Sequence, residues 1–120
     1  VQVIGVSAEK APAAYLSWKE QQPVQAPMNT VAEGLATGIG FELTQSILSD
    51  MLDDYVLVSE EEMESAVLTH LEKTHNLTEH AGAASLAAAI KIKDQLRGKK
   101  IALVMSGGNM SIAHLKQILT

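Results

Sequence analysis

The chain has 120 residues, a length that suits one compact domain and leaves no room for two ordinary ones. Nine Lys and Arg against fourteen Asp and Glu give a formal net charge of −5, and the basic residues are scattered, which argues against a nucleic-acid partner. Aromatic residues make up only 3%, so stacking platforms for bases are not expected. The lack of cysteine excludes disulfides, a zinc–thiolate site and a thiol nucleophile.

The first residues predict a buried strand. Residues 1–6 form a short apolar run without the basic residues that begin a signal peptide. No stretch of the chain reaches the roughly 18 apolar residues that a membrane span requires. We therefore expect a cytoplasmic protein with no membrane partner.

The rest of the chain alternates between helical and extended patterns. In chain order we expect a helix at 12–21, a long loop at 22–40, a helix at 41–52, a strand at 55–58, a helix at 60–74, a helix at 82–97, a strand at 101–105 and a helix at 111–119. The long loop carries two of the three prolines and three of the eight glycines, which is typical of an ordered or functional loop.

Local signals support these helices. Ser59 and Glu62 form a capping box, and the acidic run that they bracket satisfies the helix dipole. Gly98 is suited to end the alanine-rich segment 82–97. We expect apolar side chains of that segment to point inward, namely Leu86, Ala89, Ile90 and Leu96. The helix at 41–52 has an apolar stripe made of Leu43, Ile47, Leu48, Met51 and Leu52.

Three short strands separated by helices predict an α/β fold, a parallel sheet of about three strands flanked by helices in one unit spanning 1–120. Such a sheet is narrow, because sheets have about five or six strands on average. We therefore expect part of the sheet to be missing from this chain.

A turn after the last strand is the first candidate site. Ser106 and Gly107 follow the strand at 101–105, at the edge where open α/β sheets bind their ligands. The two adjacent glycines let a ligand approach the backbone and expose N–H groups. The alternative is a plain turn in which Asn109 or Ser111 caps the following helix.

Two further segments are weaker candidates. Residues 76–84 lead from polar residues into a helix that begins with small ones, which permits close packing on a sheet or a cofactor. The alternative is a connection between helices with Thr78 or Glu79 at the cap. Gly34, in the long loop, is explained equally well by a turn with positive φ.

The histidines do not predict a metal site. His70 and His75 are five residues apart, whereas two imidazoles on one helix bind one metal ion at a spacing of four. Solvated or capping roles suit these two, as well as His80 and His114.

Together these segments resemble the pyridoxal-phosphate-dependent threonine and serine dehydratases, which have the tryptophan-synthase-β-like fold. The resemblance runs in order along essentially the whole chain, through residues 3–6, 9–13, 32–36, 41–54, 58–62, 76–84 and 106–109. It implies that the chain is a portion of the large domain of a fold-type II pyridoxal-phosphate enzyme.

The resemblance also implies roles for individual residues. In the family, the serine that matches Ser106 hydrogen-bonds the pyridine nitrogen of the cofactor, in the turn that includes Gly107. A hydroxyl leaves that nitrogen largely unprotonated and weakens the ring as an electron sink, which suits β-elimination. The glycine that matches Gly34 lies beside the ring, and the glutamate that matches Glu79 lies near the site.

The departures from the family pattern are equally informative. Family members use a Schiff-base lysine and a glycine-rich phosphate loop, both upstream of the matching region, and no lysine here stands in such a context. We therefore expect the C-terminal part of a catalytic core, without a catalytic residue of its own and without cofactor binding in isolation. Ser7 and Ala13 stand at positions that carry acidic cation ligands in some members, so no metal site is expected. His80 replaces a usual glycine.

The resemblance leads to one function, and the narrow sheet leads to a second. In the first, the chain is part of an enzyme that eliminates water from threonine or serine and releases a 2-oxoacid and ammonia. In the second, it is a non-catalytic module that uses its exposed sheet edge to associate with itself or with a complementing chain.

Overall fold

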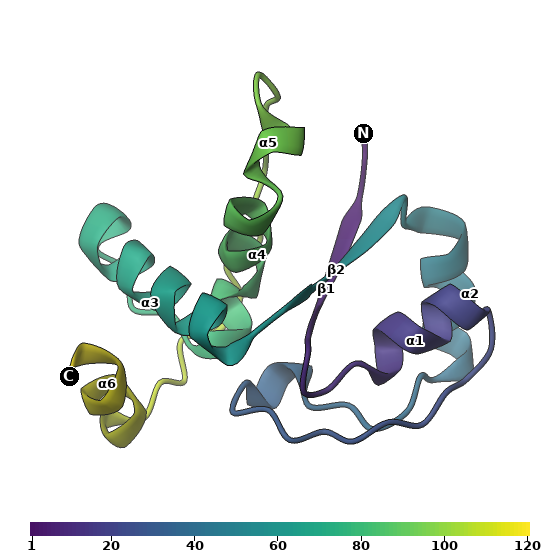
Figure 1. The fold of residues 1–120 in the computed structure, drawn as a ribbon, viewed down its shortest axis with the longest axis horizontal. Coiled ribbons are helices and arrows are strands. Elements are labelled where there is room, and N and C mark those ends of the chain that lie inside the picture. The colour runs from purple at the N-terminus through teal and green to yellow at the C-terminus, as the bar shows by residue number, and fades with distance from the viewer.

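A two-stranded parallel sheet forms the centre of the computed structural model, which describes all of residues 1–120 (Figure 1). Strand β1 (Ile4–Ala8) pairs with β2 (Asp54–Val58) over their whole length, from Ile4 opposite Asp54 to Ala8 opposite Val58. Both strands are rich in β-branched residues, which favour extended backbone. The α/β class and the parallel pairing are therefore confirmed.

Helices lie on both sides of this strand pair (Figure 1). On one side are α1 (Ala13–Glu20) and α2 (Glu42–Met51), and on the other are α3 (Glu60–Thr74) and α4 (His80–Lys91). Two short elements follow α4, namely α5 (Lys93–Leu96) and, after an extended segment, α6 (Ile112–Leu119). The long loop before α2 holds one turn of 3-10 helix, η1 (Glu33–Leu35).

The N-terminus of α3 is set by its local sequence. The Ser59 hydroxyl accepts a hydrogen bond from the Glu62 N–H at 3.1 Å, and the Glu62 carboxylate accepts one from the Ser59 N–H at 2.8 Å. The predicted capping box and the helix at 60–74 are both confirmed. The end of α5 is also as expected, because Gly98 adopts a φ of 76° there.

The predicted third strand is wrong. Residues 101–105 are extended but belong to no sheet, and their side chains are exposed. No strand of this chain lies beside them, so their backbone N–H and C=O groups form no hydrogen bonds of a sheet. One side chain contacts this backbone: the Ser85 hydroxyl donates to the Val104 carbonyl at 2.8 Å. The sheet consequently has two strands instead of about three.

The core face of α4 also differs from the prediction. The helix begins at His80 and breaks at Ile92, and its buried side chains are the small ones, such as Ala83 and Ala87. None of the four residues expected to point inward is buried, and Ile90 is 47% exposed. Alanine lets α4 approach α3 and the sheet closely. Leu86 is half-buried and packs against this core as predicted, whereas Ile90 lies on the outer face.

Helix α2 has a similar inversion. Its apolar stripe is largely exposed, with Leu43 at 77% and Met51 at 64%. The buried residue is Gln45, whose amide group donates to the Ala14 carbonyl at 3.1 Å and so holds α2 against α1.

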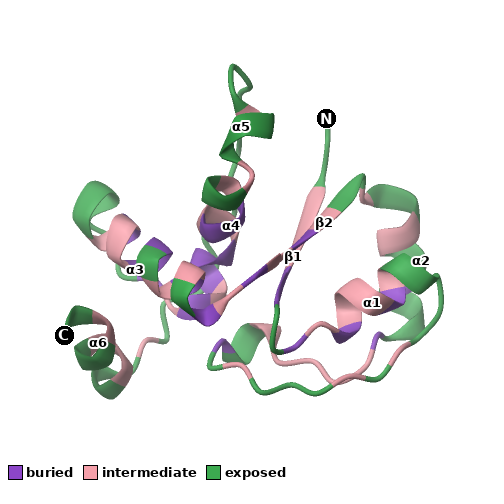
Figure 2. Ribbon diagram, in the orientation of Figure 1, coloured by how far each residue is buried: buried purple, intermediate pink, exposed green.

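The core is small and off-centre. Only 22 of the 120 residues are buried, in a molecule that measures 40 × 35 × 19 Å. Burial is concentrated where the carboxyl ends of the strands meet α3 and α4, while α5 and α6 are mostly exposed (Figure 2). No helix is both long enough and apolar enough to span a membrane.

Lys91, at the end of α4, ties α3, β2 and the residue after β1 together beside this core. Its ammonium donates to Glu9 at 3.1 Å, to Glu62 at 3.0 Å and to the Leu57 carbonyl at 2.9 Å. Burial alone would lower the pKa of Lys91, but the hydrogen bonds to the two carboxylates raise it.

Candidate functional site

The turn at 106–109 is bonded to the start of α4. The fully buried Thr78 donates its hydroxyl proton to the Gly107 carbonyl at 3.0 Å, and the Glu79 N–H donates to the same oxygen at 3.4 Å. In return, the Asn109 N–H donates to the Glu79 carboxylate at 3.0 Å. The turn and the first residues of α4 therefore form one structural unit.

Gly107 is required by this arrangement. Its φ of 81° lies in the left-handed region, which other residues adopt at a cost. A Cβ atom there would also lie 2.5 Å from a carboxylate oxygen of Glu79. Both constraints keep the turn narrow at the point where it meets Glu79.

Gly34 lies against the same start of α4. A Cβ at Gly34 would be 3.0 Å from the Ala81 Cβ and 3.8 Å from a carboxylate oxygen of Glu79. Its φ is not positive, so the turn-forming explanation of this glycine is wrong, and the close approach of η1 to α4 explains it instead. The structure thus brings Gly34, Glu79 and Gly107 together from three parts of the chain.

Ser106 presents its hydroxyl on the exposed side of this turn. The side chain is exposed and has no partner among the hydrogen bonds within the chain. The exposed backbone of Gly107 and Gly108 lies next to it. A hydroxyl beside a narrow glycine turn can donate to, or accept from, a planar ring that packs against the turn.

The capping alternatives are resolved by the hydrogen bonds. Ser111 caps α6 by accepting from the His114 N–H at 3.1 Å, as one of the two alternatives predicted. Glu79 is the N-cap residue of α4, but its side chain forms no capping bond and is used to hold the turn instead.

A polar cavity of about 150 Å³ opens beside the turn. It is lined by Val31, Glu33, Glu79, His80, Asn109, Met110, Ser111 and His114. No lysine lines it, so this chain offers no amine there for a Schiff base. No group of three His, Asp or Glu side chains is arranged to hold a metal ion.

His80 is the most unusual residue of the cavity wall. It is 4% exposed, its ring packs edge-on against that of His114 at 5.8 Å between centroids, and its Nε2 lies 4.0 Å from the Glu64 carboxylate. Burial lowers the pKa of His80, and the Glu64 carboxylate opposes this effect only in part. The His80 side chain is therefore harder to protonate than a free imidazole.

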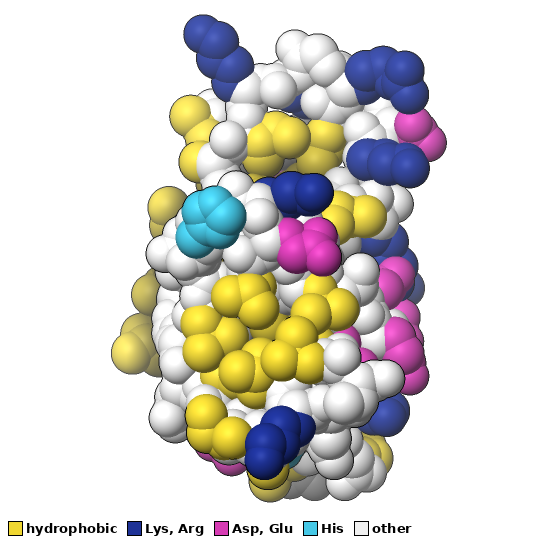
Figure 3. Space-filling model, turned by 90° about the vertical axis from the view of Figure 1, so that its left-hand side faces the viewer, with side chains coloured by type: hydrophobic (Ala, Val, Ile, Leu, Met, Phe, Trp, Pro, Cys, Tyr) yellow, Lys and Arg dark blue, Asp and Glu magenta, His cyan; other side chains and the backbone are white.

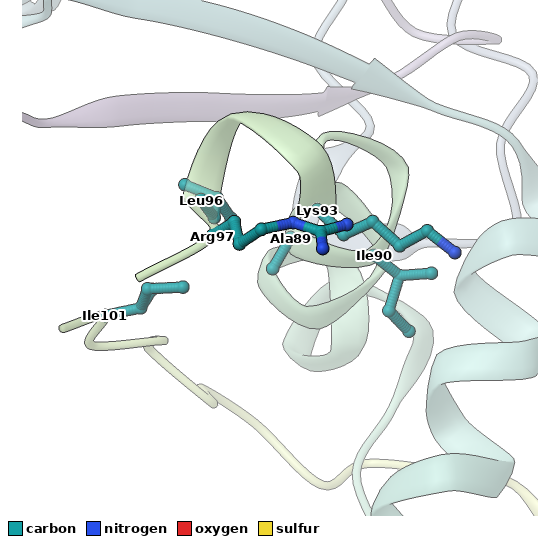
Figure 4. A pocket seen from close by; sticks show the side chains of 6 residues that line it. All are labelled: Ala89, Ile90, Lys93, Leu96, Arg97 and Ile101. Atoms are coloured by element: carbon teal, nitrogen blue, oxygen red, sulfur yellow. The ribbon is translucent and has the colours of Figure 1, made fainter. Parts of the chain in front are cut away.

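A second, apolar groove of about 260 Å³ is separate from the turn. It lies between the end of α4, α5 and the extended segment, and its walls are Ala89, Ile90, Lys93, Leu96, Arg97 and Ile101 (Figure 4). The two cationic side chains are its polar groups. It offers no acid or nucleophile and is not a candidate for catalysis.

Sequence reasoning missed two residues of the site. The sequence pattern indicates Thr78 only as a helix cap and Gly82 only as the first residue of a helix. Gly82 packs directly against the carbonyl groups of Ser106 and Gly107 and against the Thr78 hydroxyl. The run of small residues after Thr78 was the available signal, but it did not show which segment they would contact.

Comparison with known proteins identifies the family. Residues 1–107 match the family model described as pyridoxal-phosphate dependent enzyme. The L-threonine ammonia-lyase of Geobacter sulfurreducens is 37% identical over 121 residues, and the serine racemase of Dictyostelium discoideum is 34% identical over 106 residues. The crystal structure of the T.th. threonine deaminase superposes with a TM-score of 0.85 at 33% identity.

The chain belongs to the family of pyridoxal-phosphate-dependent enzymes. It spans only part of its relatives. The match to the Geobacter protein covers 99% of this chain but only 30% of that protein. The match to the Dictyostelium protein covers 87% of this chain and 32% of that protein, and the match to the threonine deaminase structure covers 92% of this chain and 40% of that structure.

The turn at 106–108 presents groups that can be compared with the ring of the family's cofactor. The exposed Ser106 hydroxyl and the adjacent glycine backbone suit the ring of pyridoxal phosphate, which supplies an electron sink when bound. The residues present therefore fit one part of the cofactor's surroundings.

Proposed function

We propose that this chain is the C-terminal part of the catalytic domain of a threonine or serine ammonia-lyase. The complete enzyme would remove the α-proton and the β-hydroxyl of a hydroxy amino acid and release a 2-oxoacid and ammonia. The observation that carries the proposal is the Ser106–Gly107 turn, held by Thr78 and Glu79. The similarity to L-threonine ammonia-lyase and threonine deaminase supports it.

In this proposal the chain supplies the ring side of the site. The Ser106 hydroxyl faces the ring nitrogen of pyridoxal phosphate, Gly107 and Gly34 border the ring, and Glu79 keeps the turn in place. The proton-transferring lysine and the phosphate-binding loop come from other parts of the enzyme. Residues 1–120 alone are therefore inactive in this proposal, and the cytoplasm is proposed as the location because the relatives are metabolic enzymes.

The test is the fate of the α-proton in variants of the intact enzyme. Ser106→Asp places a carboxylate at the ring nitrogen, which favours its protonated form and strengthens the electron sink. We expect more exchange of the α-proton with solvent deuterium per elimination event. Ser106→Ala should lower both cofactor affinity and elimination rate while leaving the fold intact, because one exposed hydroxyl contributes about 1 kcal/mol.

Ser65→Ala is the matched control, because Ser65 is exposed on α3 away from the turn. Equal partitioning between elimination and exchange in wild type and Ser106→Asp would refute the role of Ser106. Formation of 2-oxobutanoate by residues 1–120 supplied with pyridoxal phosphate and threonine would refute the need for the other parts.

Exposed apolar surface favours the second function, a non-catalytic module that assembles with itself or with a complementing chain. Residues 101–105 are unpaired, and Leu43, Ile47 and Met51 of α2 are at least half exposed. Figure 3 shows a further apolar cluster on the side of α3 and α6. Ile112 and Leu119 of α6 are exposed. Patches of this kind mark association surfaces.

A further inference from the structure

A buried carboxylate contacts the part of the loop just before Gly34, next to the point where the Asn29 N–H donates to the Lys10 carbonyl at 2.8 Å. This loop has little regular structure besides η1 and one isolated bridge between Gln25 and Ile39. The Glu60 carboxylate accepts a hydrogen bond from the Thr30 hydroxyl at 2.6 Å and another from the Val31 N–H at 3.1 Å. Glu60 is 8% exposed, although it belongs to an acidic run that would ordinarily be solvated.

The hydrogen bonds continue from Glu60 toward the site. The Thr30 hydroxyl, which donates to Glu60, also accepts from the Ala32 N–H at 3.1 Å. Ala32 is 1% exposed and packs in the core, and η1 begins at the next residue. Gly34 then lies against Ala81 of α4. The carboxylate is thus connected, residue by residue, to the glycine that borders the proposed cofactor ring.

The neighbouring glutamates do not share this role. Glu61 is exposed and accepts no hydrogen bond from the loop, while Glu62 is used by the capping box and by Lys91. Glu60 has no cationic partner, so its charge is stabilised by the two loop donors and by the N-terminus of α3. Losing either the Thr30 or the Val31 donor would leave a buried carboxylate oxygen without a hydrogen bond, which costs free energy.

We propose that Glu60 is a positioning residue that fixes the loop at 30–35 and thereby holds Gly34 at the site. An effect of Glu60 on the elimination reaction rests on the proposed function. An effect of Glu60 on how rigidly the loop is held does not. Substitution should therefore loosen the loop while leaving the strands intact.

The experiment measures amide hydrogen exchange in the intact protein for Glu60→Gln, with Glu61→Gln as the matched control. Glutamine has the same shape but no charge: its oxygen can still accept from the Val31 N–H, while its amide group can only donate to the Thr30 hydroxyl, so both bonds lose their charge-assisted strength. We expect exchange of the amides at 31–35 to rise about tenfold or more in Glu60→Gln, which corresponds to losing a hydrogen bond to a charged group. Glu61→Gln, which removes a charge from the same helical turn, should leave these amides unchanged, and the β2 amides should be unchanged in both.

Thr30→Val tests the same contact from the loop side. It is used if Glu60→Gln also raises amide exchange in the strands. It should raise exchange at 31–35 to a similar degree, and the double variant should add little to either single one. Equal loop exchange in wild type and Thr30→Val, or in Glu60→Gln and Glu61→Gln, would overturn the proposal. A loosened loop together with unaltered partitioning in Ser106→Asp would instead refute the proposed function and leave the role of Glu60 standing.

Discussion

His80 occupies a position where a positive charge is unfavourable. It is buried at the first residue of α4, and the amino end of a helix disfavours cations. The charged and titratable groups near it come from several elements and are Glu60, Glu64, Glu79 and His114, and Glu33 also lines the cavity. Because burial outweighs the carboxylates, the pKa of His80 lies below its ordinary value of 6.5.

This lowered pKa predicts a pH-dependent stability. The unfolded chain takes up a proton near pH 6.5, whereas folded His80 does so only at lower pH. Its contribution is therefore fully present above about pH 6.5 and is lost as the pH falls through the folded pKa, at up to about 1.4 kcal/mol per pH unit. Urea denaturation at pH 7.5, 6.5 and 5.5 should show a smaller loss of stability in His80→Gln than in wild type.

His75→Asn is the control for this experiment. His75 is exposed with a φ of 57°, and asparagine tolerates that backbone conformation. This variant should keep the wild-type pH dependence. If His80→Gln kept it too, burial of His80 would not be the source of the effect.

At the scale of elements, the contact between α4 and the turn depends on Gly82. A methyl group there would meet the carbonyls of Ser106 and Gly107 as well as the Thr78 hydroxyl. Alanine gains about 1 kcal/mol of helix propensity over glycine, but overpacking against backbone costs about 1–3 kcal/mol. We expect Gly82→Ala to be destabilising by about 1 kcal/mol in urea denaturation and to raise amide exchange in the turn.

Gly38→Ala provides the comparison for Gly82→Ala. The nearest atom to an added Cβ at Gly38 is the flexible Met28 sulfur at 3.4 Å. In Gly38→Ala, amide hydrogen exchange at 106–109 should be the same as in wild type. Unchanged exchange at 106–109 in Gly82→Ala would mean that the turn is held independently of this contact.

For the whole molecule, the balance of buried and exposed apolar surface predicts association. With few buried residues and an exposed apolar stripe on α2, residues 1–120 on their own should self-associate. Light scattering after size exclusion should report species larger than 12.8 kDa. Leu43→Lys with Ile47→Lys should reduce this association.

Thr44→Lys with Ser46→Lys adds the same charge to exposed polar positions of the same helix and is the matched control. It should leave association close to wild type. A monodisperse wild-type monomer would contradict both the prediction and the assembly function.

The sequence by itself determined the local features and the family. The capping box of α3 and the ends of most helices depend on residues within about four positions of one another, so their patterns are readable without the fold. The ordered motifs likewise sufficed for the pyridoxal-phosphate resemblance, because they preserve both residue type and chain order.

Only the tertiary structure decided which segments meet and which faces are buried. Glu60 holds Thr30, and Glu79 holds Asn109, across thirty residues of chain in each case, a separation over which no local pattern specifies a partner. The apolar stripe of α2 and the extended segment 101–105 are exposed because hydrophobic periodicity identifies an apolar face but not the surface that covers it. Burial depends on the neighbouring elements, and those are set by the fold as a whole.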